Sequence, residues 1–176
     1  MKFVRPAPVH KAAAEEYIRE FYEYGSEING SGSLDRYLQE HSYEEWLEHL
    51  AAQMDIANIA PGKVPSATYF YVREEDSRIV GMINIRLSLN DFLRRECGHI
   101  GYSIRPTERR RHYATEMLRS ALEICRKVNI GEVILTCGRE NAASARVIEN
   151  CGGRQTEEFY SETFDETIRR YVIDNR

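Results

Sequence analysis

HIGYSIRPTERRRHYATEML, residues 99–118, holds a strand, a basic turn and the start of a helix in direct succession. The segment from His99 to Ile104 predicts a short strand that Pro106 closes, because proline cannot donate to a strand ladder. From Tyr113 to Val128, apolar residues recur every three or four positions, which predicts an amphipathic helix. A helix N-terminus presents unpaired N–H groups, so the turn at 105–112 is a candidate site for phosphate.

The basic turn contrasts with an acidic chain. The net charge of the 176 residues is -4, whereas the segment from Arg105 to Arg111 holds four arginines and one glutamate. An acidic protein is not expected to bind nucleic acid in general, and a local cationic cluster favours a discrete anionic ligand. A solvated helix start would explain the same charges. The turn also lacks glycine between Arg105 and Ala114, although glycine usually lets a backbone approach a phosphate closely.

The remaining elements fit one domain over 1–176. Helical spacing, with a capping box at Ser42 and Glu45, predicts helices over 9–24 and 42–54, and another begins after Asn141. Strands are predicted over 2–5, 67–73, 78–87, 133–137, 154–160 and 167–173, with a mobile loop at 29–33. This order predicts an α/β fold, a mixed sheet with helices on both faces. The strands at 99–104 and 133–137 should form a right-handed, parallel βαβ unit with the basic turn at its ligand-binding end.

The sequence also argues against several protein classes. The cysteines have neither CxxC nor metal-ligand spacing, so we expect free thiols and no metal site; they are Cys97, Cys125, Cys137 and Cys151. The N-terminus lacks the apolar core of a signal peptide, and no apolar run approaches the roughly 18 residues of a membrane span. We therefore expect a cytoplasmic protein with no membrane partner.

RRRHYA, from Arg109 to Ala114, resembles the acyl-CoA-binding signature Q/R-x-x-G-x-G/A of the GNAT acetyltransferase superfamily. Arg109 matches the first position and Ala114 the last, while His112 stands where the first glycine is usual. Upstream, GYSIRP at 101–106 is similar to the strand that carries the pantetheine arm. Downstream, NAAS at 141–144 and ENCGG at 149–153 resemble the second half of that fold. The chain looks most like bacterial acetyltransferases of this superfamily that have no assigned substrate.

The resemblance implies the GNAT fold, with a mixed, mostly antiparallel sheet and helices on both faces. It implies acetyl-CoA as acyl donor, lying in a split between the strands of Ile104 and Val133. Main chain at 103–105 would pair with the pantetheine amides, and an N–H near Ile104 would polarise the acyl carbonyl. The implied cofactor-binding residues are Ser103, Ile104, Arg105, Arg109, Arg110, Arg111, His112, Tyr113, Ala114, Thr115, Asn141 and Ser144.

His112 is the residue of this turn that departs from the family signature, and it affects how tightly the turn binds phosphate. If the glycine slot requires a positive φ, a Cβ there costs about 1 kcal/mol. We expect a negative φ instead, because His-Tyr-Ala still opens a helix well. His112 should then weaken CoA binding without abolishing it.

The resemblance also implies a general base, because an amine with a pKa near 10 is protonated at neutral pH. His99 and Glu96 are the candidates, with His99 the better placed, and water alone is the remaining alternative. A purely structural, hydrogen-bonded role would equally account for His99. The tyrosine that relatives use as general acid corresponds to Ile148 here. Its possible substitutes, each of which packing alone would also explain, are Tyr102, Tyr113 and Tyr160.

We therefore expect an N-acetyltransferase that moves acetyl from acetyl-CoA directly to a primary amine of a small molecule or peptide. A CoA-binding module or sensor without turnover is the alternative. The helix around Glu44, Glu45 and Glu48 is acidic, which suits a cationic amine and equally a solvated helix face. The last strands could pair two copies into a homodimer.

Overall fold

The structure is a computed structural model that describes residues 1–176, apart from the side chain of Asn58. Its helices are α1 (Lys11–Glu23), α2 (Leu34–Glu40), α3 (Tyr43–Met54), α4 (Tyr113–Lys127) and α5 (Ala142–Asn150). Its strands are β1 (Lys2–Val4), β2 (Ser66–Val72), β3 (Ile79–Arg86), β4 (Ile100–Ile104), β5 (Glu132–Gly138), β6 (Arg154–Ser161) and β7 (Glu166–Asp174). Short helical turns occupy Pro8–His10, Ile56–Asn58, Leu93–Cys97 and Pro106–Glu108. The predicted helices and strands are confirmed, with small differences at their ends.

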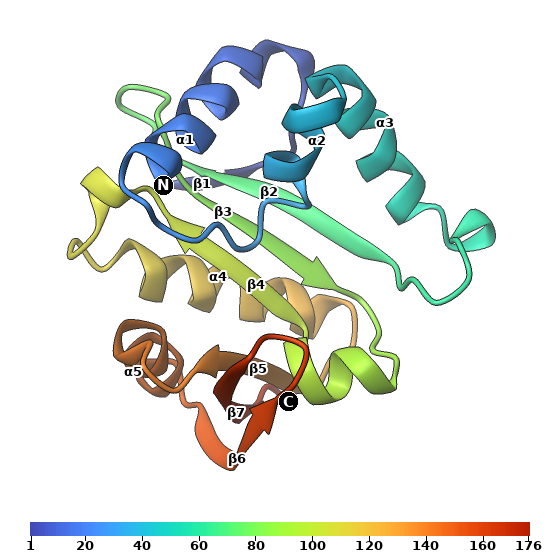
Figure 1. Ribbon diagram of the computed structural model, residues 1–176, viewed down its shortest axis with the longest axis vertical. Coiled ribbons are helices and arrows are strands. Elements are labelled where there is room, and N and C mark those ends of the chain that lie inside the picture. The colour runs from blue at the N-terminus through green and yellow to red at the C-terminus, as the bar shows by residue number, and fades with distance from the viewer.

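The strands form two antiparallel sheets, ordered β1-β2-β3-β4 and β5-β7-β6. In Figure 1, α1, α2 and α3 lie over one face of the first sheet, and α4 lies under its other face. One apolar core fills the space between the first sheet and α1 to α3, with Trp46 and Phe70 at its centre. A second core joins α4 and α5 to both sheets. The expected α/β fold with helices on both faces is therefore confirmed.

Local signals set two of the helix starts as predicted. Ser42 Oγ accepts the N–H of Glu45 at 3.2 Å, and the Glu45 carboxylate accepts the N–H of Ser42 at 2.7 Å. At α5, the side chain of Asn141 accepts the N–H of Ser144 at 3.0 Å. Each bond satisfies a donor that a helix start leaves free.

The predicted parallel pairing of β4 with β5 is wrong. The two strands belong to different sheets. Just before β4, Gly98 forms an isolated bridge with Leu135 of β5, and the His99 N–H donates to the Ile134 carbonyl at 2.7 Å. Further along β4, no backbone hydrogen bonds join it to β5 in the described structure. Here β4 contacts α5 instead, where the Tyr102 hydroxyl lies 3.0 Å from the hydroxyl of Ser144. One side of β4 is thus open within the described structure.

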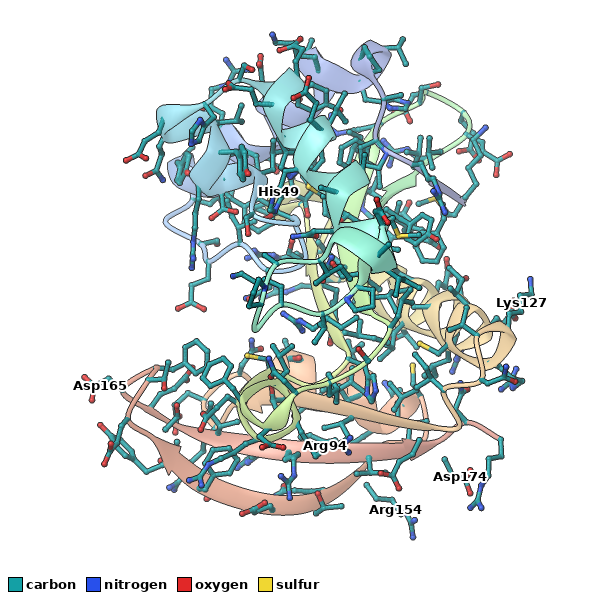
Figure 2. All side chains as sticks on the ribbon, turned by 90° about the vertical axis from the view of Figure 1, so that its right-hand side faces the viewer. His49, Arg94, Lys127, Arg154, Asp165 and Asp174 are labelled. Atoms are coloured by element: carbon teal, nitrogen blue, oxygen red, sulfur yellow. The ribbon has the colours of Figure 1, made fainter. Side chains whose placement is uncertain are left out.

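Figure 2 shows the β5-β7-β6 sheet from the side, with Asp165 at its hairpin and Arg154 and Asp174 at the opposite end. The segment predicted as a mobile loop, 29–33, has no strand or long helix and lies against β4. Gly30 approaches Gly101 so closely that a Cβ on it would lie 2.3 Å from the Gly101 carbonyl oxygen. None of the helices in the described structure combines the length and hydrophobicity that crossing a bilayer requires.

Candidate functional site

The open side of β4 presents backbone groups of alternate residues. The N–H of Arg105 donates to a carbonyl of β3 at 2.9 Å, and Ser103 pairs with β3 in the same register. Since backbone groups alternate in direction along an antiparallel strand, those of Tyr102 and Ile104 point away from β3, toward the split. The expectation that Ser103 and Arg105 offer main-chain bonds to a pantetheine arm is therefore wrong for these two residues. At Ile104 the N–H is available, whereas the carbonyl accepts from Arg109 Nε at 3.3 Å.

The side chain of Ser103 is also occupied on the face of β4 that α1 covers. Its hydroxyl donates to the Asn29 carbonyl at 2.6 Å, and the Tyr17 hydroxyl donates to the Ser103 carbonyl at 3.0 Å. Ser103 thus anchors the segment before α2 to the strand rather than facing the split.

The loop between β4 and α4 carries a continuous run of free donors. The N–H of Arg109 donates to the Pro106 carbonyl at 3.4 Å, and the first bond of α4 runs from the Glu116 N–H to the His112 carbonyl at 3.1 Å. Between them, from Arg110 to Thr115, the described structure contains no acceptor for any backbone N–H. Unpaired N–H groups at a helix start carry partial positive charge, so this run can bind a phosphate.

His112 has φ 63 and ψ 2, so the expected negative φ is wrong. Arg110 is left-handed as well, with φ 64. The chain must reverse tightly between β4 and α4, and these two residues make the reversal without glycine. A left-handed residue next to a right-handed one gathers successive N–H groups into a concave anion site. The same left-handed geometry that strains the backbone at Arg110 and His112 thus also brings the N–H groups of the loop together.

Arg105 does not contribute its charge to this loop. Its side chain is fully buried, with Nη1 at 2.9 Å from Glu16 and 3.0 Å from Glu20 of α1 and with Nε donating to the Ile79 carbonyl. The sequence-based assignment of Arg105 to the cofactor site is therefore wrong for its side chain as well as its N–H.

The three other arginines lie at the loop surface. Arg109 donates to Ser26 Oγ at 3.2 Å and stacks over the Phe21 ring, while Arg111 pairs with the buried Glu108 at 3.3 Å. Arg110 is exposed and has no ion pair among the described residues. The net charge near the loop is thus smaller than the sequence suggests, which leaves the backbone donors as its main anion-binding feature.

The first turn of α5 meets β4 at the split. Asn141 is exposed and caps the helix, and Ser144 contacts the Tyr102 hydroxyl. Burial raises the pKa of Tyr102, so its hydroxyl stays protonated at neutral pH and can donate a hydrogen bond. Of the other tyrosines considered as acids, Tyr160 is exposed and bonded to Asp165 on the β6–β7 hairpin, and Tyr113 lies in the first turn of α4.

His99 is held as a structural residue. It is 7% exposed, and its Nδ1 accepts the N–H of Ile134 at 3.0 Å. Burial, together with the charges of Arg94 and Arg86, lowers the pKa of His99 to about 4. A ring this weakly basic, with one nitrogen already accepting a bond, is a poor proton acceptor.

Glu96 lies next to His99 and keeps an uncommitted oxygen. Its side chain is 10% exposed, and Oε1 lies 3.2 Å from Arg95. Oε2 is buried without a hydrogen-bond partner among the described atoms. Thr136 of β5 donates to the Glu96 carbonyl at 3.0 Å, which places Glu96 beside the point where β4 and β5 separate. The geometry thus favours Glu96 over His99, the reverse of the order taken from the sequence.

The cysteines are free, and Cys137 and Cys151 pack in the core that joins α4 and α5 to both sheets. Burial raises the pKa of both thiols, so neither is a ready nucleophile at neutral pH. Among the residues that the structure describes, no group of His, Cys, Asp and Glu side chains is placed to hold a metal ion.

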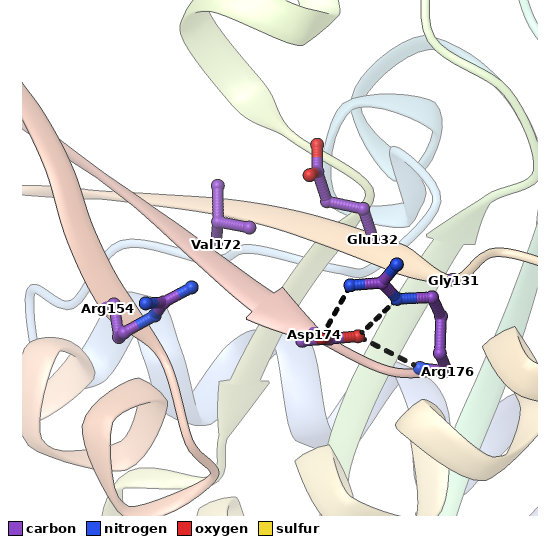
Figure 3. A pocket seen from close by; sticks show the side chains of 6 residues that line it. All are labelled: Gly131, Glu132, Arg154, Val172, Asp174 and Arg176. Carbon is purple, nitrogen blue, oxygen red and sulfur yellow. Dashed lines mark hydrogen bonds and ion pairs between the residues drawn. The ribbon is translucent and has the colours of Figure 1, made fainter.

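A surface hollow of about 360 Å³ lies away from these residues, where β5 begins and β7 ends (Figure 3). Asp174 and Arg176 pair across it at 2.8 Å. It contains none of the predicted site residues; its lining consists of Gly131, Glu132, Arg154, Val172, Asp174 and Arg176.

Comparison with known proteins identifies one family and many solved structures that share the fold of this chain. A family model described as acetyltransferase (GNAT) domain matches residues 1–154. A ribosomal-protein-S5-alanine acetyltransferase from Vibrio fischeri superimposes with a TM-score of 0.70 at 12% identity, over 99% of this chain and 91% of that one. The ribosomal L7/L12 alpha-N-protein acetyltransferase RimL, in complex with coenzyme A, gives 0.69 at 14% identity, over 99% and 94%.

A variant of spermidine N-acetyltransferase SpeG from Vibrio cholerae gives a TM-score of 0.64 at 13% identity, over 99% of this chain and 95% of that one. At such identities the likeness establishes the fold. No curated protein matches the chain.

Proposed function

Because this chain belongs to the GNAT acetyltransferase domain family, we propose that it transfers the acetyl group of acetyl-CoA directly to a primary amine. The acceptor is a small molecule or a peptide. The observation that carries the proposal is the run of free N–H groups from Arg110 to Thr115, which continues from the open side of β4. A solved structure of this fold, RimL, is a complex with coenzyme A.

In this proposal the loop N–H groups hold the pyrophosphate of CoA, helped by Arg109, Arg110 and Arg111. Tyr102 offers its main-chain groups to the amides of the pantetheine arm, which lies along β4 like an additional strand. The arm then reaches the point where β4 and β5 separate, beside Glu96. No metal takes part.

The transfer step uses few groups of the protein. The amine nitrogen attacks the thioester carbon, the new C–N bond forms, and the C–S bond breaks. Glu96 takes one proton from the protonated amine before the attack, and the Ile104 N–H stabilises the oxygen of the tetrahedral intermediate. The second proton of the nitrogen passes to the departing thiolate. The Tyr102 hydroxyl donates a hydrogen bond to the departing sulfur. A thiol with a pKa near 8.5 leaves without a stronger acid.

The test combines binding and turnover. Calorimetry measures CoA binding, and release of free thiol from acetyl-CoA is followed with spermidine and with peptides that have free N-termini. The solved relatives include enzymes for both acceptor classes. We expect CoA to bind and at least one acceptor to release thiol. Absence of CoA binding contradicts the proposal.

Glu96→Gln tests the base. We expect kcat to fall about 100-fold or more with little change in KM for acetyl-CoA, as for loss of a general base. Asp91→Asn is the matched control, because it removes an exposed carboxylate from the same segment. A wild-type rate in Glu96→Gln would assign deprotonation to water.

The second candidate is a CoA-binding module or sensor without turnover. It is favoured by His99, whose lowered pKa and occupied Nδ1 remove one of the two bases considered. Tight CoA binding with no thiol release across the acceptor panel would support it. A cytoplasmic location and a homodimer through β6 and β7 complete the proposal, and size-exclusion chromatography with light scattering tests the dimer.

A further inference from the structure

Glu20, on α1, is a buried carboxylate that the transfer chemistry does not use. Its side chain is 11% exposed. Oε1 accepts both the N–H and the hydroxyl of Thr107, at 2.9 and 2.8 Å. Oε2 accepts from Arg105 at 3.0 Å. One carboxylate thus fixes two positions in the turn that leads from β4 into the loop of free N–H groups.

A second buried carboxylate holds the same turn from the other side. Oε2 of Glu108 lies 3.0 Å from Arg73 at the end of β2 and 3.3 Å from Arg111 of the loop. Its Oε1 lies 3.6 Å from Arg78, just before β3. The turn is therefore fastened to α1 through Glu20 and to the β2–β3 connection through Glu108.

The charge state of Glu20 fits this role. Burial alone would raise the pKa of its carboxyl, but the hydrogen bonds from Thr107 and Arg105 outweigh burial and lower it. The carboxylate is therefore ionised at neutral pH. Hydrogen bonds to a charged oxygen are shorter and stronger than neutral ones, so they restrict Thr107 firmly.

We propose that Glu20 is a positioning residue for the pyrophosphate-binding loop. By fixing Thr107, it keeps the N–H groups from Arg110 to Thr115 aimed at one anion before the ligand arrives. Donors that are ordered in advance bind more tightly, because the ordering cost does not fall on the binding step. The inference rests on the proposed function and makes α1 part of the cofactor site.

Glu16 provides a matched control on the same helix. It lies about one turn before Glu20 and also accepts from Nη1 of Arg105, at 2.9 Å. It is 52% exposed, and the described structure shows no bond between it and Thr107. Glu16→Gln therefore removes a carboxylate partner of Arg105 while the contact to the turn stays in place.

The experiment measures the binding of CoA by calorimetry and of pantetheine, which lacks the pyrophosphate, by NMR titration. For Glu20→Gln we expect the Kd for CoA to rise about 10-fold, as for loss of a charge-assisted bond, with the Kd for pantetheine unchanged. Glu16→Gln should bind both ligands like wild type.

Thr107 gives a second test that does not touch the buried ion pairs. Thr107→Val removes the hydroxyl donor and should weaken CoA binding several-fold, whereas Thr107→Ser keeps the donor and should match wild type. If wild type binds CoA and both Glu20→Gln and Thr107→Val bind it equally well, the inference is wrong. An equal loss for CoA and pantetheine also overturns it, because a general structural defect would act on both. Failure of wild type to bind CoA refutes the proposed function instead.

Discussion

His112→Gly should stabilise the protein. His112 is exposed and holds φ 63, a conformation in which its Cβ crowds the following carbonyl oxygen. Glycine adopts this conformation without that crowding. The substitution removes no hydrogen bond of the His112 side chain in the described structure, so the backbone effect stands almost alone.

The expected size follows from two opposing effects. Relief of the left-handed strain is worth about 1–2 kcal/mol. The greater freedom of glycine in the unfolded chain costs about 0.5–1 kcal/mol. The free energy of unfolding should therefore rise by about 0.5–1 kcal/mol. For a chain of this length, this corresponds to an increase in Tm of about 1–4 °C.

Thermal and urea unfolding of wild type and His112→Gly measure the difference. Ala114→Gly is the control, because residue 114 lies in the first turn of α4 with ordinary helical geometry, and glycine there should cost about 0.5–1 kcal/mol. Arg110→Gly, at φ 64, should resemble His112→Gly. A Tm that falls in His112→Gly as much as in Ala114→Gly would refute the strain argument.

Three further predictions concern other parts of the fold. Folding lowers the pKa of His99 from 6.5 to about 4, so between pH 7 and 4 the unfolded chain takes up a proton that the folded chain does not. The free energy of unfolding should therefore fall by up to about 3 kcal/mol over this range. Urea titrations should show a smaller fall in His99→Asn, which keeps a hydrogen-bond acceptor. Gly30→Ala should destabilise by about 2 kcal/mol or more in thermal melts, because its Cβ would meet the Gly101 carbonyl, and Gly25→Ala, also at positive φ but with open space around it, should cost less. Ser42→Ala should lower the unfolding free energy by about 1 kcal/mol and Ser42→Asp should not, as circular dichroism in urea would show.

The sequence predicted most elements of this fold because their signals are local. The capping box at Ser42 and the Asn141 cap act within three residues, and the apolar period of α4 lies within one helix. The order of strands and helices then leaves few arrangements. The predicted pairing of β4 with β5 is wrong because the rule behind it applies to one continuous sheet, whereas β4 and β5 belong to two sheets and Tyr102 of β4 contacts Ser144 of α5.

Long-range contacts explain what the sequence did not provide about the site. From the sequence, Arg105 is expected to add its positive charge to the basic turn. In the structure its carboxylate partners lie on α1, about 85 residues earlier. The role of Glu20 could not be predicted for the same reason, because its partner Thr107 is also distant in the sequence. Helical periodicity identifies Glu20 only as one of several acidic residues on the first helix. His99 and Glu96 could be ranked only once the bond from Ile134 and the enclosed Glu96 oxygen were visible.

The path of the backbone between β4 and α4 determines the conformation of His112, so its positive φ could not be predicted from the residue type. Residue preference favoured an ordinary helix start, whereas the reversal from β4 into α4 imposes left-handed geometry at Arg110 and His112. A glycine at either position would have signalled it.

The open side of β4 also differs from an ordinary sheet edge in how it meets other molecules. An exposed edge strand invites pairing with other chains and leads to aggregation. Here the unpaired groups of Tyr102 lie inside the molecule, with Ser144 on one face of the strand and Gly30 packed on Gly101 at the other. Because contacts cover both faces of β4 at this point, another strand does not find a bare sheet edge there, and the protein keeps an incomplete sheet without the aggregation risk of an exposed edge.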